Sequence, residues 1–285
     1  MPYVPRLPQV LFLTVLPALA GSLTSRTPYH GASDLVAHPS GAVLAEAWFS
    51  NSAGLQKALE HASVTVELRR GDTWETVGVG RTDGEGRVAV AFNAPVTLGR
   101  YPLRWTAEGQ RAEATLHVLA GDVPVTVFDI DGTLSTSDSE NFKDYARRLL
   151  RHAKAEGPKL RPGAVAAVRR AAALGPVVYL SGRAPWLGRP TREWLAFHQL
   201  PEGILILMPE ARDILPTEGR VGRAKTERLQ ALKALGFTFR AAYGNARTDI
   251  HAYATVGVDK ARTFILGKHG GEEGTVKLGE GFPAE

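Results

Sequence analysis

The chain has 285 residues, 44% of them apolar and 22% charged, which is enough for one large or two modest globular domains with a sizeable core. It contains no cysteine, so disulfide frameworks, thiolate nucleophiles and zinc–thiolate sites are excluded. The net charge of +5 favours anionic partners in general. No run of Lys and Arg interleaved with aromatic residues indicates nucleic acid, and none is expected as a partner.

An apolar stretch near the N-terminus, Val10–Ala20, is too short to span a bilayer. It follows Arg6 and ends in Ala18-Leu19-Ala20, the small-x-small pattern of a signal-peptidase site. We therefore predict a signal peptide over residues 1–20 and export of a mature protein that is soluble or membrane-peripheral. The alternative is a buried N-terminal strand in a cytoplasmic protein.

Residues 21–42 are rich in Ser, Pro, Gly and His without periodicity, which predicts a linker. From residue 43 to residue 120, short runs alternate apolar with polar residues and are separated by glycine-containing turns. The clearest runs cover residues 63–70, 87–92, 100–105 and 112–119. This spacing is typical of an antiparallel sandwich of about seven strands, and we predict an immunoglobulin-like domain over 43–120.

From residue 121 to residue 285, apolar strands alternate with amphipathic helices, which indicates a parallel sheet built of βαβ units. The predicted strands cover residues 125–130, 177–180, 204–207, 238–243 and 263–266. The predicted helices cover residues 140–155, 163–174, 191–199, 224–235 and 248–256. The glycine-rich tail after Lys268 shows no usable pattern.

Two aspartates, Asp129 and Asp131, end the first of these strands and are followed by Gly132 and Thr133. Ligands gather at the carboxyl ends of strands in open α/β sheets, and alternate residues of an extended chain point the same way. Asp129 can therefore attack phosphorus and Asp131 can transfer protons, in a hard oxygen-rich site that suits Mg²⁺. The alternative is an acidic turn that caps the next segment.

A DxDGT run after a buried strand resembles the first motif of the haloacid dehalogenase superfamily, which implies a Rossmann-like α/β core. Three further motifs follow in the expected order. By this resemblance, Ser181, Gly182 and Arg183 bind the transferring phosphoryl group together with Thr133, and Lys225 neutralises nucleophile and phosphate. Asn245 and Asp249 complete the metal environment of Asp129 and Asp131.

The two places where superfamily members insert cap domains are short in this chain, so we expect a capless core. An open site admits bulky substrates such as lipid head groups, phosphoproteins or nucleic-acid ends, and disfavours sugar phosphates and nucleotides.

The fourth motif resembles the GNxxxDxxAY pattern of the lipin-type phosphatidate phosphatase catalytic domain. Other matches are Asp129–Thr133 with Ser137-Asp138, and Thr191, Arg192, Leu195, Leu200, Pro201 and Gly203 after the second motif. Gly182 stands where this family is expected to have alanine. The resemblance covers residues 125–266 and implies Mg²⁺-dependent hydrolysis of phosphatidate, at a membrane surface, to diacylglycerol and phosphate.

Two alternatives stay open: a phosphatase of another bulky phosphomonoester, and a non-catalytic phosphatidate-binding module. Catalysis is favoured because Asp129 and Asp131 are both present. No pattern in the sequence assigns an oligomeric state or a partner of the sandwich.

Overall fold

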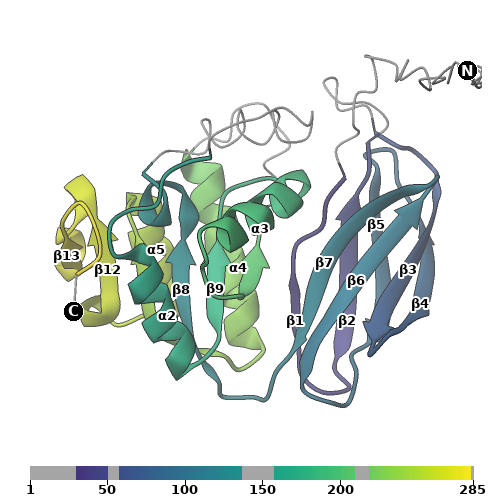
Figure 1. The fold of residues 1–285 in the computed structure, drawn as a ribbon, viewed down its shortest axis with the longest axis horizontal. Helices are drawn as coiled ribbons and strands as arrows, with labels where there is room; N and C mark the ends of the chain where they lie inside the picture. The colour runs from purple at the N-terminus through teal and green to yellow at the C-terminus, as the bar shows by residue number, and fades with distance from the viewer. Residues whose placement is uncertain (1–29, 51–57, 137–156, 209–217, 284–285) are drawn as a thin grey trace, which may run out of the picture.

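The computed structural model describes residues 30–50, 58–136, 157–208 and 218–283. Within these ranges an all-β unit lies beside an α/β unit (Figure 1). The predicted signal peptide, the predicted helix 140–155 and the Ser137-Asp138 pair lie outside the described residues. None of the helices in the described ranges is both long and apolar enough to cross a bilayer.

The all-β unit consists of a five-stranded and a two-stranded sheet. The larger sheet has the order β1 (Leu35–Ala37), β7 (Gln110–Val118), β6 (Gly99–Ala107), β3 (Ser63–Arg70) and β4 (Thr73–Arg81). In the smaller sheet, β2 (Ala42–Trp48) pairs with β5 (Arg87–Asn93). The pairings are antiparallel except that β1 runs parallel to β7.

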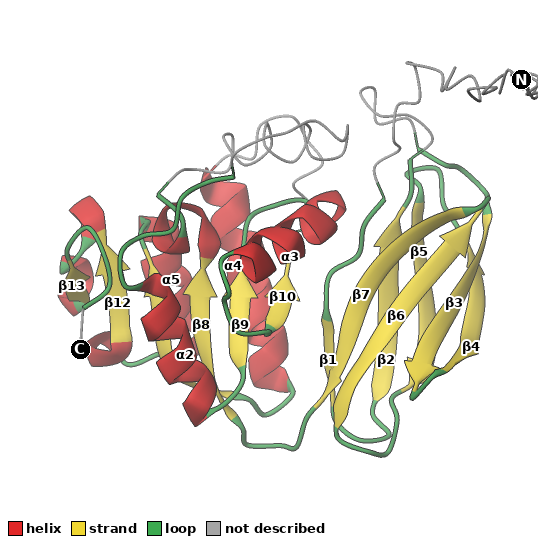
Figure 2. Cartoon of the chain, viewed as in Figure 1, coloured by secondary structure: helices red, strands yellow, loops and turns green. Residues whose placement is uncertain are grey.

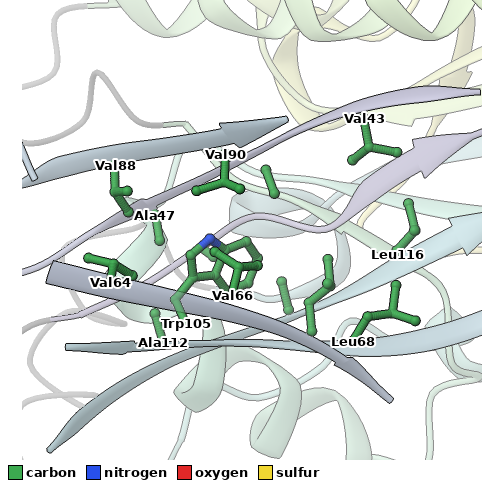
Figure 3. Packing of buried hydrophobic residues seen from close by; sticks show 14 of the residues in the cluster. Val43, Ala47, Val64, Val66, Leu68, Val88, Val90, Trp105, Ala112 and Leu116 are labelled. Atoms are coloured by element: carbon green, nitrogen blue, oxygen red, sulfur yellow. The ribbon is translucent and has the colours of Figure 1, made fainter. Parts of the chain in front are cut away.

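The apolar positions of these strands face one interior between the two sheets. Val64, Val66 and Leu68 of β3 are fully buried, as is Trp105 of β6, and they share one cluster with Val88 and Val90 of β5. Figure 3 shows these side chains converging on a common interior. The period-two alternation in the sequence thus corresponds to one buried and one outward face of β3, β5 and β6.

The segment expected as a linker contains β1 in its described part, residues 30–42. On one side β1 pairs with β7, Leu35 opposite Leu116. On the other side the N–H of Asp34 donates to the carbonyl oxygen of Leu205, 3.0 Å away, and the N–H of Leu207 donates to Ser33 Oγ at 3.1 Å. This segment therefore bridges the two units, and its three-residue strand is too short to leave a periodic pattern.

The α/β unit contains six strands in which every neighbouring pair is parallel. Their order is β10 (Ile204–Ile206), β9 (Val177–Leu180), β8 (Pro124–Asp129), β11 (Thr238–Gly244), β12 (Thr263–Leu266) and β13 (Val276–Leu278). The first five coincide with the predicted strands to within one residue at each end. The sixth, β13, lies in the tail for which the sequence gives no pattern.

Helices cover both faces of this sheet (Figure 2). Phe128 packs with α2 (Ala164–Leu174) and α3 (Gly188–Phe197). Its neighbour Val127 points to the opposite face and packs with α4 (Glu218–Ala234) and α5 (Arg247–Val256). A strand covered on both faces is apolar throughout, which explains its continuous apolar run. Short helical turns are η1 (Ile130–Leu134), η2 (Pro185–Leu187), η4 (Lys260–Arg262), η5 (Gly267–His269) and η6 (Glu272–Gly274).

Candidate active site

The candidate residues meet because β9, β8 and β11 are parallel neighbours. Asp129 ends β8 opposite Leu180 of β9, so the chain continues from there into Ser181. β11 lies on the other side of β8 and continues into Asn245. Parallel strands present their carboxyl ends at the same edge of a sheet, so three separate motifs converge there.

Asp129 and Asp249 share one buried lysine. Lys225 Nζ lies 2.7 Å from Asp129 Oδ1 and 2.6 Å from Asp249 Oδ1. Burial raises the pKa of the Asp129 carboxyl, and Lys225 opposes that rise. Burial lowers the pKa of Lys225, but the two carboxylates outweigh it and keep the pKa above its ordinary value. Lys225 is therefore a permanent cation against the predicted nucleophile.

The second oxygen of Asp129 is held by the turn that follows β8. Thr133 Oγ1 donates to Asp129 Oδ2 at 2.7 Å. Gly132 has φ of +80°, and a Cβ at that position would lie 2.3 Å from the side-chain amide of Asn245. Only glycine combines this left-handed conformation with so close an approach. The glycine in the DxDGT run therefore brings the first and fourth motifs together.

The atoms around the Asn245 side-chain amide indicate whether the site suits a cation. One terminal atom of this amide lies 3.3 Å from Asp129 Oδ2 and 3.2 Å from the carbonyl oxygen of Asp131. When no cation is considered, the better assignment of that atom is the amide nitrogen, which can donate hydrogen bonds to both of these oxygens. With the amide turned over, its oxygen lies 3.3 Å and 3.2 Å from these two oxygens, close to the ~3 Å edge of a Mg²⁺ octahedron, whose ligand distances are about 2.1 Å. These residues fit Mg²⁺.

Asp249, which the sequence predicts as a metal ligand, lies beside Lys225 and the backbone that follows β11. Its Oδ1 accepts from Lys225, and its Oδ2 accepts from the N–H groups of Asn245 and Ala246 at 3.0 and 3.1 Å. Both oxygens are thus engaged by protein donors. Among the described residues no group of three His, Asp or Glu side chains is arranged to hold a metal.

Asp131 forms an ion pair with Arg183, which the sequence predicts to bind the substrate phosphate. Arg183 is 1% exposed, and its Nε and Nη2 donate to the Asp131 carboxylate at 2.8 to 3.2 Å. Its Nη1 donates to Thr191 Oγ1 at 3.0 Å, and Ser181 Oγ donates to Asp131 Oδ2 at 3.0 Å. The second motif therefore orients the predicted proton-transfer group. Gly182 packs against Val221 of α4, which a Cβ would approach to 3.0 Å.

One further residue at this site has no signal in the sequence. Arg161 donates from Nε to the carbonyl oxygen of Gly132 at 2.9 Å and from Nη1 to the carbonyl oxygen of Glu280 at 3.0 Å. It therefore ties the turn after β8 to the C-terminal segment. The partner atoms are backbone carbonyls far along the chain, and no motif spacing records such contacts.

Comparison with known proteins finds similarity to one domain family and to several longer proteins. Residues 126–267 match the family model described as the LNS2 domain of PITM 1-3. Membrane-associated phosphatidylinositol transfer protein 3 of Mus musculus is 29% identical over 206 residues, which cover 68% of this chain and 19% of that protein. Membrane-associated phosphatidylinositol transfer protein 1 of Homo sapiens is 29% identical over 202 residues, which cover 68% of this chain and 14% of that protein.

Human phosphatidate phosphatase LPIN1 is 27% identical over 185 residues, covering 56% of this chain and 19% of that protein. This chain spans less than a fifth of the length of these three relatives. Residues 126–267 are thus similar to the LNS2 domain, and the proteins similar to this chain include one named a phosphatidate phosphatase and others named phosphatidylinositol transfer proteins. The solved Pnkp1/Rnl/Hen1 complex aligns at 15% identity with a TM-score of 0.37, covering 61% of this chain and 54% of that chain, too low to bear on the fold.

Proposed function

We propose that the α/β unit is a Mg²⁺-dependent phosphatase that hydrolyses phosphatidate to diacylglycerol and phosphate at a membrane surface. The observation that carries the proposal is the buried Asp129, held between Lys225 and Thr133 with Asp131 two residues away. A carboxylate fixed beside a cation, next to a second carboxylate, is equipped for nucleophilic and acid–base catalysis on a phosphate.

In the proposed reaction an oxygen of Asp129 bonds to phosphorus while the bond from phosphorus to the alcohol oxygen breaks. The Asp131 carboxyl gives its proton to the leaving alkoxide, which departs as the alcohol. Asp131, now a carboxylate, takes a proton from a water molecule as that water attacks phosphorus. Phosphate leaves and Asp129 is regenerated, so that one water is consumed for each alcohol and phosphate formed.

Electrostatic support comes from the groups around the nucleophile. Lys225 offsets negative charge on Asp129 and on the incoming phosphate. Asp129, the carbonyl oxygen of Asp131 and Asn245 would hold Mg²⁺, which when bound neutralises phosphate charge. Asp249 positions both Lys225 and the backbone of Asn245.

The lipid substrate rests on the relatives. One is named a phosphatidate phosphatase, and the others are named phosphatidylinositol transfer proteins. These transfer proteins also favour the second candidate function, a phosphatidate-binding module without turnover. The presence of both Asp129 and Asp131 favours hydrolysis.

Fold and location belong to the same proposal. The six parallel strands with the site at their carboxyl ends support a haloacid dehalogenase-type core. Its capless form rests on the short segments at the two cap-insertion places in the sequence. The two facing β-sheets support an immunoglobulin-like sandwich. Export rests on the pattern of residues 1–20 in the sequence.

The test is phosphate release from phosphatidate in mixed micelles with Mg²⁺, comparing wild type with Asp129→Asn. The matched control is Asp122→Asn, the same isosteric change at an exposed position before β8. Release that EDTA and Asp129→Asn abolish, and Asp122→Asn does not, supports the proposal. Release only from an aryl phosphate, a phosphopeptide or a 3′- or 5′-phosphorylated oligonucleotide would reject the lipid. Lipid binding without any release would favour the binding module.

A further inference from the structure

The segment before β1 packs against the loop of the second motif. Gly31 pairs with Trp48 of β2 through two backbone hydrogen bonds of 3.0 and 3.1 Å. A Cβ on Gly31 would lie 2.1 Å from the carbonyl group of Pro185, two residues after Arg183. The all-β unit thus touches the active-site loop directly, backbone against backbone.

Asp34, in the same segment, joins three elements from the two units. It accepts from the N–H of Thr115 in β7 at 2.6 Å and from the N–H of Leu205 in β10 at 2.8 Å. It also accepts from both terminal nitrogens of Arg192 in α3, at 2.6 and 3.0 Å. His117 Nε2 lies 3.6 Å away. The Asp34 side chain has no exposed surface, so this is an internal junction.

The junction leads to the active site through one turn of α3. Thr191, the residue before Arg192, accepts from Arg183 Nη1 at 3.0 Å. Arg183 in turn makes the ion pair with Asp131. Two adjacent residues of α3 are therefore bonded to different parts of the molecule, Arg192 to the all-β unit and Thr191 to the active site.

We propose that Asp34 is a positioning residue, which fixes α3 through Arg192 and thereby holds Arg183 in the position that orients Asp131 toward the leaving group. This inference rests on the proposed function. The all-β unit then acts as a fixed support of the active site.

Comparing substrates with different leaving groups distinguishes this positioning role from a purely structural role. An alkoxide needs a proton from a general acid as it departs, whereas nitrophenolate is a far weaker base and departs without one. Misplacing Asp131 therefore lowers kcat/KM, which covers the steps up to the transfer of phosphorus to Asp129, selectively for an alkyl phosphate. General loss of folded protein would instead lower the rates on both substrates by the same factor.

The experiment compares wild type, Asp34→Asn, Arg192→Gln and Arg192→Lys on short-chain phosphatidate and on p-nitrophenyl phosphate. Arg192→Gln is the milder variant, because Asp34 keeps its bonds to the N–H groups of Thr115 and Leu205. The control is Glu193→Gln, which breaks the exposed Arg189–Glu193 pair of the same helix.

For Asp34→Asn and Arg192→Gln we expect kcat/KM on the phosphatidate to fall about tenfold, since general acids contribute about 10² to 10⁴ in rate. On the aryl phosphate, kcat/KM stays within about twofold, and Arg192→Lys recovers most of the loss on the phosphatidate. An equal fall on both substrates, or no fall on the alkyl one, overturns the inference.

Amide hydrogen exchange over residues 181–197 tests the structural link without turnover. Exchange there should be faster in Arg192→Gln than in wild type or Glu193→Gln. Unchanged exchange overturns the inference whatever the kinetics. If wild-type protein hydrolyses neither substrate, the proposed function fails, and the exchange result alone decides whether Asp34 fixes the second motif.

Discussion

Arg192 donates two hydrogen bonds to Asp34 across the boundary between the two units, Nη2 to Oδ1 at 2.6 Å and Nη1 to Oδ2 at 3.0 Å. The two residues are 158 positions apart in the sequence. An ion pair with one partner fully buried is costly to break, because the remaining charge loses its compensation. Separation of the two units would expose Asp34 and leave Arg192 without it.

This pair predicts an acid-dependent loss of stability. Burial raises the pKa of Asp34, but Arg192 and His117 outweigh it and lower the pKa from 3.8 to about 2. A carboxyl with a lower pKa in the folded chain stabilises fully above its unfolded pKa and loses that contribution as pH falls toward its folded pKa. Between pH 4 and pH 2, wild type should lose about 2 kcal/mol more unfolding free energy than Asp34→Asn.

Urea unfolding at several pH values measures this difference. All other carboxyl groups titrate in both proteins, so their contributions cancel when the two curves are subtracted. Parallel pH dependences of wild type and Asp34→Asn would show that Asp34 is not held ionised by the junction.

The buried cation of the active site gives a second prediction. Lys225→Met leaves Asp129 and Asp249 buried without their shared partner, and breaking such a pair costs about 3–5 kcal/mol. Lys233→Met on the same helix is the control, since Lys233 Nζ donates to an uncharged acceptor, the carbonyl oxygen of Val256. Thermal and urea unfolding should show a large loss for Lys225→Met and at most about 1 kcal/mol for the control.

A second substitution sharpens that test. Asp249→Asn in the Lys225→Met background removes one of the two uncompensated charges, so it should restore part of the lost stability. If the double variant instead loses the sum of the stabilities lost by the two single variants, then Lys225 does not pair with Asp249.

Much of the α/β unit follows from the sequence, because its strands are continuous apolar runs and its polar motifs stand where those runs end. The run that ends at Asp129 is buried on both faces of the sheet, and this forces the uninterrupted pattern. The contacts of Asp131 cannot be predicted from the sequence in the same way. Ser181 and Arg183 are 50 and 52 positions away, and motif spacing does not say whether Arg183 turns to a carboxylate or to the substrate.

The junction between the units is also absent from the sequence pattern. Asp34 stands in a polar stretch that looks like a linker, and its partners Thr115 and Leu205 are 81 and 171 positions away. These bonds use backbone N–H groups, which every residue except proline possesses. β13 is hidden for another reason: three residues are too few to show a period.

The oxygen set around Asn245 predicts stabilisation by Mg²⁺. A ligand that binds only the folded chain stabilises it by about 2.7 kcal/mol at a concentration 100 times its dissociation constant. We expect Mg²⁺ to raise the Tm of wild type, and Asn245→Ala to remove that rise. Asn93→Ala, the same change at an exposed position of β5, should leave the rise intact. An equal rise in Asn245→Ala would place the cation elsewhere.

Two glycine variants can separate the effect of the close approach of Gly132 to Asn245 from the effect of backbone strain at a left-handed position. Gly132→Ala introduces a residue at φ of +80° and places its Cβ 2.3 Å from the Asn245 amide. Gly236→Ala introduces the same kind of strain at φ of +84° with nothing within 4 Å of the new Cβ. Both variants should lose about 1 kcal/mol from the left-handed conformation, and Gly132→Ala should lose more and also its Mg²⁺-dependent rise in Tm.

A double-mutant cycle assigns that excess to Asn245. In the Asn245→Ala background the clashing amide is gone, so Gly132→Ala should cost no more than Gly236→Ala does. Urea unfolding of the four proteins in the cycle measures the coupling. If Gly132→Ala costs as much with Asn245 as without it, then the turn after β8 does not set the position of the amide, and the cation site does not depend on that contact.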